Sequence, residues 1–367
     1  MISKIMRLWV LKALLAMLLA GCEPNNQSTP SSQGFAGLGT EVEGFAQVQP
    51  NPLITYPEAL AKHPDYRIEW WYVTANLETT SGEPLGIQWT LFRQAASPSP
   101  QREGLASQQL WLGHVGLTTG DQHFSADRYG RGGIGQAGIE MQPFSAWIDH
   151  WSLEAMDENA SDFTLKASET LLGEVPFGYE LTLQKTGPAV LQGDQGFSVK
   201  SPQGQASYYV SLPFLAAKGS VNIEGESYEV TGQAWLDREW SSQPLAADQE
   251  GWDWFSLHLD QGDKLMLFRL RHTEANDYFS GTYITAEGIP HPLKPEQIQM
   301  QPLRQHPVAG RQVPVEWQLS VDDFGINLRT QALNPDAWMA TGIAYWEGPI
   351  RFEGTHQGWG YLEMTGY

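Results

Sequence analysis

Cysteine is nearly absent from this chain. Cys22 is the single cysteine among 367 residues, so no disulfide can form within the chain. No His-Glu-x-x-His motif is present either, so a zinc site lacks support, and we expect no metal and no cofactor. Without disulfides the fold depends on its core, and 14 of the 15 tryptophans follow Cys22.

Basic residues are also few. The chain has 22 Lys and Arg against 42 Asp and Glu, which gives a formal net charge of −20. Such a charge repels nucleic acid, so nucleic-acid binding is excluded as a function class. No Gly-x-Ser-x-Gly elbow supports a serine hydrolase, and the glycine-rich residues 130–135 precede no helical pattern that would bind a dinucleotide.

The first residues have the features of a signal peptide. Basic residues precede an apolar stretch at residues 8–19, which is too short to cross a bilayer as a helix. The stretch ends in Leu19-Ala20-Gly21-Cys22, a pattern that suits cleavage before the cysteine and attachment of a lipid to its thiol. We therefore predict that residues 1–21 are removed and that Cys22 carries two or three acyl chains, enough for stable anchoring.

This interpretation predicts an exported lipoprotein that faces the periplasm. The alternative is an ordinary signal peptide with a chance cysteine. Glu23 follows Cys22, so the aspartate that retains lipoproteins in the inner membrane is absent, and the outer membrane is expected. Residues 22–50, rich in Asn, Gln, Ser, Gly and Pro, are predicted to form a flexible tether.

From about residue 51 the chain shows short aromatic and β-branched runs broken by Gly, Pro, Asp and Asn, which predict antiparallel strands. A pattern also recurs. Its first copy is Trp70-Trp71-Tyr72 followed by Leu91-Phe92-Arg93, and its second is Trp252-Asp253-Trp254-Phe255 followed by Leu267-Phe268-Arg269. The copies are expected to end alike, at 204–211 and 358–367. We predict an all-β protein with two related antiparallel β-barrel or half-barrel domains, at residues 51–218 and 219–367.

Several segments carry a resemblance to a known family. They are Glu69-Trp70-Trp71-Tyr72, Trp147-Ile148-Asp149, Leu191-Gln192-Gly193-Asp194-Gln195-Gly196, Gly232-Gln233-Ala234-Trp235-Leu236-Asp237-Arg238-Glu239-Trp240, Gly251-Trp252-Asp253-Trp254-Phe255, Tyr345-Trp346-Glu347-Gly348 and Gly360-Tyr361-Leu362-Glu363-Met364-Thr365-Gly366-Tyr367. With them the chain resembles the AttH-like group, which is related to carotenoid 1,2-hydratase (CrtC). The resemblance implies two tandem lipocalin-like domains.

The resemblance leaves the function open. Similar proteins are described as secreted hydrolases or as components associated with ABC export systems. The hydratase branch adds water to a carotenoid double bond without a cofactor, and this sequence looks closer to the AttH branch.

Asp237 and Glu239 are the first candidates for catalysis. Positions i and i+2 of a strand face the same way, so both carboxyl groups and Trp235 would share a face, opposite Arg238 and Trp240. Crowding two acids beside aromatic rings raises one pKa, and the acid that stays protonated could donate to an alkene carbon. The alternative is an ion-pair network with Arg238 or a neighbouring arginine.

Glu69 and Asp253 lie within aromatic runs that are expected to be buried. Each has an arginine on the neighbouring run, Arg93 in one case and Arg269 or Arg271 in the other, so buried ion pairs are the simplest explanation. The alternative is a polar group at the base of a ligand pocket.

His114 is the histidine best placed for acid–base chemistry, because it begins a run in the first copy of the repeat. A histidine in a cleft can donate or accept a proton near neutrality, but a single one is more often a packed core or surface residue. The aromatic side chains could likewise form the core or line a ligand site. The candidate ligand-binding residues are Glu69, Trp71, Trp240, Trp252, Asp253, Tyr283 and Trp346.

Three functions follow from these features. The first is a lipid-anchored protein that binds an apolar small molecule or lipid and acts as a carrier beside an ABC export system. The second is a cofactor-free hydratase or hydrolase acting on a terpenoid or lipid through carboxylate chemistry. The third is an assembly protein without a small ligand, and a filled interface between the domains would favour it.

Overall fold

Most strands of the protein have one apolar and one mixed face. We describe the fold from a computed structural model, which covers residues 43–98, 102, 104–169, 177–243 and 248–367. The predicted signal peptide, Cys22 and most of the predicted tether lie outside the described residues. In β1 (Ile68–Thr79), Trp71 and Val73 point into the main hydrophobic core, whereas Trp70 and Tyr72 contact a separate aromatic cluster. This alternation follows from the two-residue period of a strand.

Within the part of the chain that the structure describes, the first sheet has 13 strands. Its main path runs in the order β4-β3-β2-β1-β13-β12-β9-β8-β7-β6-β5, and β10 and β11 pair with β12. Besides β1, the strands are β2 (Pro84–Ala95), β3 (Gln109–Thr118), β4 (His123–Arg131), β5 (Ala137–Glu140), β6 (Ser145–Ile148), β7 (Trp151–Ala155), β8 (Asp162–Glu169), β9 (Phe177–Lys185), β10 (Val190–Leu191), β11 (Phe197–Val199), β12 (Ala206–Ile223) and β13 (Glu226–Ser241).

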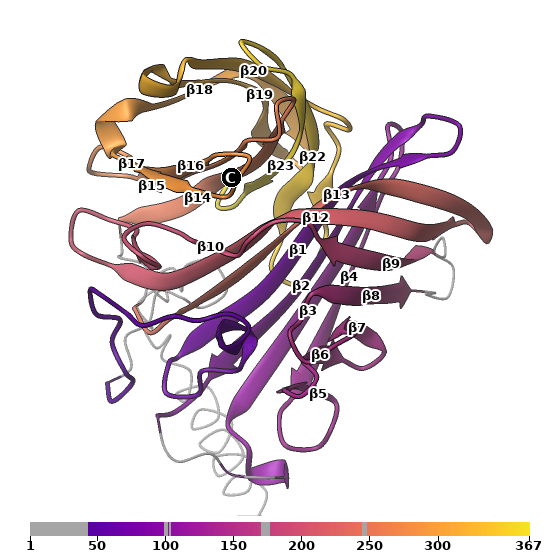
Figure 1. Cartoon of the computed structure of the whole chain (residues 1–367), viewed down its shortest axis with the longest axis vertical. Helices are drawn as coiled ribbons and strands as arrows, with labels where there is room; N and C mark the ends of the chain where they lie inside the picture. The colour runs from indigo at the N-terminus through magenta and orange to yellow at the C-terminus, as the bar shows by residue number, and fades with distance from the viewer. Residues whose placement is uncertain (1–42, 99–101, 103, 170–176, 244–247) are drawn as a thin grey trace, which may run out of the picture. The chain divides into compact units, whose positions relative to one another are not determined.

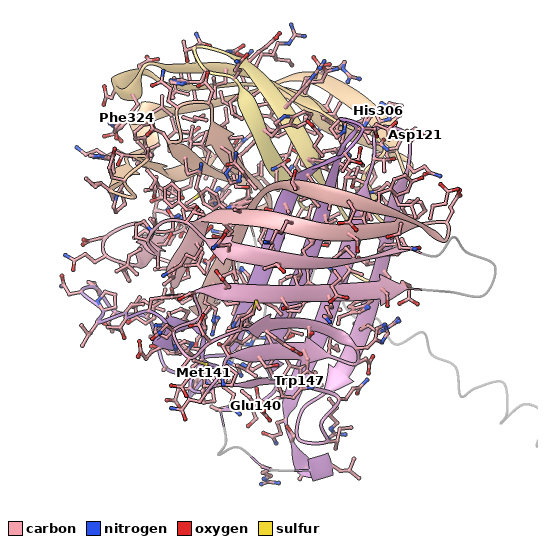
Figure 2. The ribbon with its side chains drawn as sticks, turned by 45° about the vertical axis from the view of Figure 1, so that its right-hand side comes forward. Asp121, Glu140, Met141, Trp147, His306 and Phe324 are labelled. Atoms are coloured by element: carbon pink, nitrogen blue, oxygen red, sulfur yellow. The ribbon has the colours of Figure 1, made fainter. Side chains whose placement is uncertain are left out.

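This first sheet is strongly curved and forms a half-barrel. Its β6 contacts β2, β3 and β4, although it lies far from them in the order of pairing. Figure 2 shows Glu140, Met141 and Trp147 at the end of the sheet that β5 and β6 form. The concave side is filled by the largest hydrophobic cluster, which includes Trp89 and Trp151.

The second sheet has ten strands among the described residues 248–367 and is nearly closed into a barrel (Figure 1). Its order is β17-β16-β15-β14-β23-β22-β20-β19-β18, with β21 paired to β22, and β16 also contacts β18. The strands are β14 (Gln249–Leu259), β15 (Lys264–His272), β16 (Tyr278–Ile284), β17 (Pro290–Leu293), β18 (Ile298–Val308), β19 (Arg311–Val321), β20 (Ile326–Ala332), β21 (Trp338–Met339), β22 (Tyr345–Gly354) and β23 (Gly358–Met364).

The predicted all-β architecture is confirmed. All pairings in both sheets are antiparallel, and the described residues contain no α-helix. They contain four three-residue 3-10 helices: η2 (Glu58–Leu60), η3 (Gly104–Ala106), η4 (Pro295–Gln297) and η5 (Asp322–Phe324). Within the same residues no helix is long and apolar enough to cross a membrane.

The predicted repeat also appears as matching hairpins. Strands β1, β2 and β3 are consecutive neighbours in the first sheet, as β14, β15 and β16 are in the second. In register, Trp70 pairs with Phe92 and Trp254 pairs with Phe268. The expected correspondence between residues 204–211 and 358–367 is wrong. Residues 358–364 form β23, which pairs with β14. Its counterpart in the first sheet is the strand that pairs with β1, and this strand is β13 and not β12, which begins at Ala206.

The sheets divide later in the chain than the predicted boundary at 218–219. That boundary falls inside β12, and the first sheet continues to Ser241. Gly219 is no linker residue, because it lies where β12 runs so close to β9 that an added Cβ would be 2.1 Å from the carbonyl oxygen of Glu180. Both sheets belong to one compact unit. The described end of the predicted tether is packed, since Phe45 and Val48 are buried.

Candidate active site

A cavity of about 300 Å³ lies where the outer face of the second sheet meets the first. The strands β1, β2, β3, β12 and β13 line it from one side and β14, β15 and β23 from the other. The interiors of the two sheets are instead filled by their own hydrophobic clusters. The ligand space therefore lies between the sheets and not inside one barrel, which is where small β-barrels commonly hold a ligand.

The repeat builds opposite walls of this cavity. On β1, Trp70 lies between Phe92 and Glu239 of the neighbouring strands. On β14, Trp254 lies between Phe268 and Glu363 in the same way. All six residues line the cavity, so each copy of the repeat supplies two aromatic rings, and the strand that pairs with its first strand supplies one carboxyl group.

Asp237 is a buried acid in the cavity wall. It is 2% exposed. Its Oδ1 accepts hydrogen bonds from Ser211 Oγ and Trp235 Nε1, both at 2.6 Å, and its Oδ2 accepts one from the Tyr209 hydroxyl at 2.6 Å. Burial raises the pKa of Asp237 to about 7, although these three donors favour the charged form.

Glu363, which is half-buried, is the second acid of the wall with a raised pKa. Its Oε1 accepts a hydrogen bond from Trp252 Nε1 at 2.6 Å. Burial raises the pKa of Glu363 to about 7, and the negative charges of Asp237 and Glu239 act in the same direction. Among the described residues, no basic side chain forms an ion pair with Asp237 or Glu363. Two acids that titrate near neutrality thus face one largely apolar cavity.

Glu239 has a different environment from Asp237, although the two share a strand face as predicted. The Ser207 hydroxyl donates to Glu239, and Lys200 Nζ lies 2.9 Å from its Oε1. The Lys200 ammonium group also lies over the rings of Tyr209 and Phe268, at 4.5 and 5.0 Å from their centroids. The ion pair expected as the alternative for Glu239 is therefore present, but its partner is Lys200 and not an arginine.

Another buried acid lies behind the cavity wall. The hydroxyl of Tyr72, a residue that lines the cavity, donates to Oε1 of Glu347 on β22. Burial raises the pKa of Glu347 well above its ordinary value, and its Oε2 has no hydrogen-bond partner among the described residues. Glu347 and Glu363 are direct neighbours across β22 and β23. The wall of the second sheet is thus acidic, and neither acid has an ion-pair partner among these residues.

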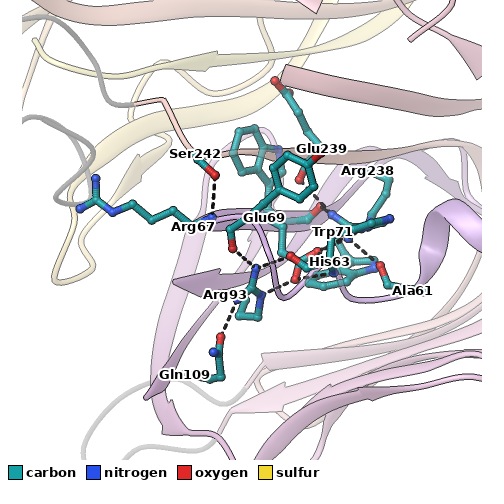
Figure 3. Close-up of polar contacts among 12 residues, drawn as sticks. Ala61, His63, Arg67, Glu69, Trp71, Arg93, Gln109, Arg238, Glu239 and Ser242 are labelled. Carbon is teal, nitrogen blue, oxygen red and sulfur yellow. Dashed lines mark hydrogen bonds and ion pairs between the residues drawn. The ribbon is translucent and has the colours of Figure 1, made fainter. Parts of the chain in front are cut away.

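Glu69 is held in the buried ion-pair network that Figure 3 shows. Arg93 and Arg238 both contact its carboxylate, and the backbone N–H of His63 donates to Oε2 at 2.9 Å. Burial alone would raise the pKa of Glu69, but the two guanidinium groups hold it well below its usual range. Glu69 and Arg93 reach the cavity as a neutralised pair. The predicted structural explanation therefore fits this site.

Asp253 forms the corresponding network inside the second sheet. Its Oδ2 lies 3.6 Å from Arg269 and 3.9 Å from Arg271, and its Oδ1 accepts a hydrogen bond from the Tyr367 hydroxyl at 2.8 Å. Burial raises the pKa of Asp253. Asp253 does not line the cavity.

His114 does not reach the cavity. Its Nδ1 lies 3.1 Å from the hydroxyl of Tyr345, which does line it, and its Nε2 is buried without a partner among the described residues. Burial lowers the pKa of His114 to about 4, so the ring is neutral at pH 7. A direct acid–base role for His114 is therefore not supported by its position.

The predicted ligand-binding residues divide into two groups. Glu69 and Trp252 line the cavity. The others lie elsewhere: Trp71 and Trp346 are buried in the two cores, Trp240 stacks on His63 and Tyr283 stacks on Phe324. Most of the aromatic residues that the sequence offers as ligand contacts are thus core residues. No group of three or more His, Cys, Asp or Glu side chains in the described part of the chain could hold a metal ion.

Sequence reasoning missed Tyr72, Tyr209, Glu347 and Glu363. The repeat held a signal for Glu363, because this residue occupies beside Trp254 the place that Glu239 occupies beside Trp70. The wrong match between the strand ends concealed this correspondence. The two tyrosines could not be found without the register between strands that are far apart in the sequence.

Comparison with known proteins identifies the family. The sequence profile of the AttH-like family matches residues 47–367. This chain belongs to the AttH-like family. A crystal structure of a candidate AttH from Nitrosomonas europaea is 34% identical to this AttH-like protein, with a TM-score of 0.76. That match covers 88% of this chain and 99% of the other.

Two further solved structures share the fold of this AttH-like protein. Kievitone hydratase from Nectria haematococca is 17% identical, with a TM-score of 0.64, over 89% of this chain and 96% of its own. CghA with Sch210972 is 13% identical, with a TM-score of 0.53, over 89% and 97%. At these identities the likeness concerns the fold alone. A search of curated proteins found no match.

Proposed function

We propose that this AttH-like protein is a cofactor-free acid–base enzyme that adds water to, or removes it from, a carbon–carbon double bond of an apolar small molecule. The observation that carries the proposal is the pair Asp237 and Glu363, two acids without ion-pair partners among the described residues and with pKa values of about 7, in the wall of one apolar cavity. Catalytic acids and bases work best when their pKa lies near the working pH. Kievitone hydratase shares the fold, which is compatible with this chemistry.

The hydration step balances with these two groups. A protonated carboxyl group transfers its proton to one alkene carbon, and the π electrons form the new C–H bond and leave a carbocation on the other carbon. Water then attacks the cation and forms the C–O bond, and the ionised carboxylate takes the proton that the water loses. The rings of Trp70 and Trp254 can stabilise the cation through their faces.

The hydrogen bonds favour one distribution of roles. Asp237 accepts from three donors, one of which, the Trp235 N–H, cannot reverse its direction. Hydrogen bonds to a carboxylate favour its charged form, and we assign Asp237 as the base. Glu363 accepts from Trp252 and lies beside negative charge, so it is the acid that keeps its proton.

The test uses residues 23–367, which lack Cys22, incubated with a panel of terpenoid and long-chain alkenes in oxygen-18 water. Mass spectrometry should find one substrate that gains a water molecule with one labelled oxygen. Glu363→Gln and Asp237→Asn should each lower turnover at least 100-fold, because general acid or base catalysis contributes about 10²–10⁴-fold. Glu316→Gln, a carboxyl outside the cavity, is the matched control. Full activity in Asp237→Asn would contradict the assigned roles.

A carrier of an apolar ligand is the second candidate function. It is favoured by the aromatic and aliphatic lining and by a volume at the lower end of the range for small-molecule sites. Native mass spectrometry of the same protein, followed by organic extraction, separates the two. A stoichiometric apolar molecule that is retained in Asp237→Asn and never converted supports the carrier.

We also propose that the protein acts at a membrane, exported and held there by a lipid on Cys22, with the outer membrane as the expected location. The signal-peptide features and the Leu19-Ala20-Gly21-Cys22 motif support this proposal. An association with an ABC export system stays a prediction from the family resemblance. Metabolic labelling with an alkyne fatty acid tests the anchor, since Cys22→Ser should abolish the label.

A further inference from the structure

An exposed apolar lip borders the entrance of the cavity, and we propose that this lip docks on the surface of a lipid bilayer. The lip consists of Leu105, Leu110, Tyr129 and Ile134. Their exposed fractions are 75%, 50%, 59% and 49%. Clustered apolar side chains of this kind mark protein or membrane contacts, whereas single ones need no explanation.

The lip is continuous with the cavity. Leu110 and Tyr129 line the cavity, and among its described lining residues they are the most exposed. These two side chains therefore lie where the cavity wall meets solvent. They lie on neighbouring strands, where Leu112 pairs with Tyr129 and Leu110 pairs with Arg131.

The loops that carry Leu105 and Ile134 are in contact. A Cβ added to Gly133 would lie 2.7 Å from the carbonyl oxygen of Gly104, so the two backbones touch beside the apolar side chains. The N–H of Gly132 donates to the carbonyl oxygen of Gln109 at 2.9 Å. These contacts place both loops at the same end of β3 and β4 as Leu110.

The described chain begins at the same end of β2 and β3 as this lip. A Cβ added to Gly44 would lie 2.9 Å from Cγ of Pro98, which follows the end of β2, and Ala95 of β2 pairs with Gln109, the neighbour of Leu110. The chain thus enters the fold at the end of the protein where the cavity opens. The 20 residues between Cys22 and Glu43 can span at most about 75 Å, so a lipid on Cys22 would hold the protein near a bilayer without orienting it.

A bilayer is the occupant that fits these observations. The cavity is apolar, and its ligands concentrate in membranes rather than in water. A lip that touches the bilayer would let a ligand pass from the membrane to the cavity without crossing water. The net charge of −20 repels anionic headgroups, so a zwitterionic surface is the expected partner. At physiological salt the charge repulsion is screened beyond about 8 Å, so it does not keep the protein away from such a surface.

The experiment uses vesicles of phosphatidylcholine and phosphatidylethanolamine and the protein without its lipid, as residues 23–367. This chain has no cysteine, so one can be introduced for labelling. An environment-sensitive fluorophore on Ile134→Cys should shift to the blue when vesicles are added. The same fluorophore on Ile289→Cys should not shift, since Ile289 has similar exposure, 56%, but lies in the turn between β16 and β17.

A second measurement removes the lip without touching the cavity. Leu105→Ser/Ile134→Ser should lower vesicle co-flotation about tenfold or more, because two apolar side chains lose their burial in the bilayer. Ile289→Ser should bind as well as the unaltered protein. Equal shifts at positions 134 and 289, or unchanged co-flotation of the double variant, would overturn the proposal, and a partner protein would then be the better occupant. Neither readout depends on catalysis, so the proposal of a docking surface and the proposal of an enzyme can be refuted separately.

Discussion

The protein is expected to lose stability between pH 5 and pH 7, and Asp237→Asn is expected to remove part of that loss. The pKa of Asp237 is raised to about 7 in the folded protein by burial, against about 3.9 in an unfolded chain. Between these values the folded state holds a proton that the unfolded state has released. Raising the pH therefore favours unfolding, by about 1.4 kcal/mol per pH unit for one group.

The size of this loss follows from the two pKa values. From pH 5 to pH 7 the titration of Asp237 lowers the free energy of unfolding by roughly 2.5 kcal/mol, and the loss levels off above the folded pKa. The asparagine side chain cannot titrate, and it can keep the hydrogen bonds from Ser211 and Trp235 at the cost of rearranging the one from Tyr209. That cost, about 1 kcal/mol, does not depend on pH. The variant should thus gain stability relative to the unaltered protein as the pH rises from 5 to 7, whatever its fixed cost.

Urea unfolding followed by tryptophan fluorescence at pH 5, 6, 7 and 8 measures this difference. Asp322→Asn, at an exposed carboxyl group, is the matched control and should show the same pH dependence as the unaltered protein. Glu363 also titrates in this range, so the unaltered protein loses more than Asp237 accounts for alone. A difference between Asp237→Asn and the unaltered protein that stays constant from pH 5 to pH 8 would refute the assignment of a raised pKa.

Three further changes have expected outcomes in the same urea assay. Arg93→Met should lower the free energy of unfolding by about 3 kcal/mol, because it removes one of the two guanidinium groups that neutralise buried Glu69; a loss below about 1 kcal/mol would show that the pair is not needed. Glu347→Gln should change stability at pH 7 by less than about 1 kcal/mol, because burial already keeps this acid protonated, and a large gain would show instead that it is ionised. Tyr367→Phe should cost about 1–2 kcal/mol through the lost hydrogen bond to Asp253, and an unchanged midpoint would argue against that bond.

The sequence predicts the strands because their chemistry is local. Aromatic and β-branched runs between turn residues mark the hairpins, and the recurring Leu-Phe-Arg segments identify β2 and β15 as counterparts. The pairing of strands distant in sequence is not local. Strand β13 lies beside β1, although Asp237 and Tyr72 are far apart in the chain, and no pattern in either segment states that they pair.

The site is predictable only in part for the same reason. Asp237 and Glu239 share a face because side chains of a strand alternate with a period of two residues. The hydrogen bond from Trp235 to Asp237 agrees with this period. The different environments of the two acids depend on Lys200, which reaches Glu239 from the segment between β11 and β12. The choice between core and cavity for each tryptophan depends on the curvature of both sheets, and for that reason the sequence does not show that Trp71 and Trp346 lie in the two cores.

The two carboxyl groups of the site belong to different sheets, and this makes their acidity sensitive to the size of what binds. Asp237 is carried by β13 of the first sheet and Glu363 by β23 of the second. A molecule too large for the cavity has to push the sheets apart, admits water and separates the two charges. Each of these changes lowers the pKa of Glu363 and so removes its proton at neutral pH. The proposed hydration would then discriminate against oversized molecules through the loss of its proton donor, even when they bind well.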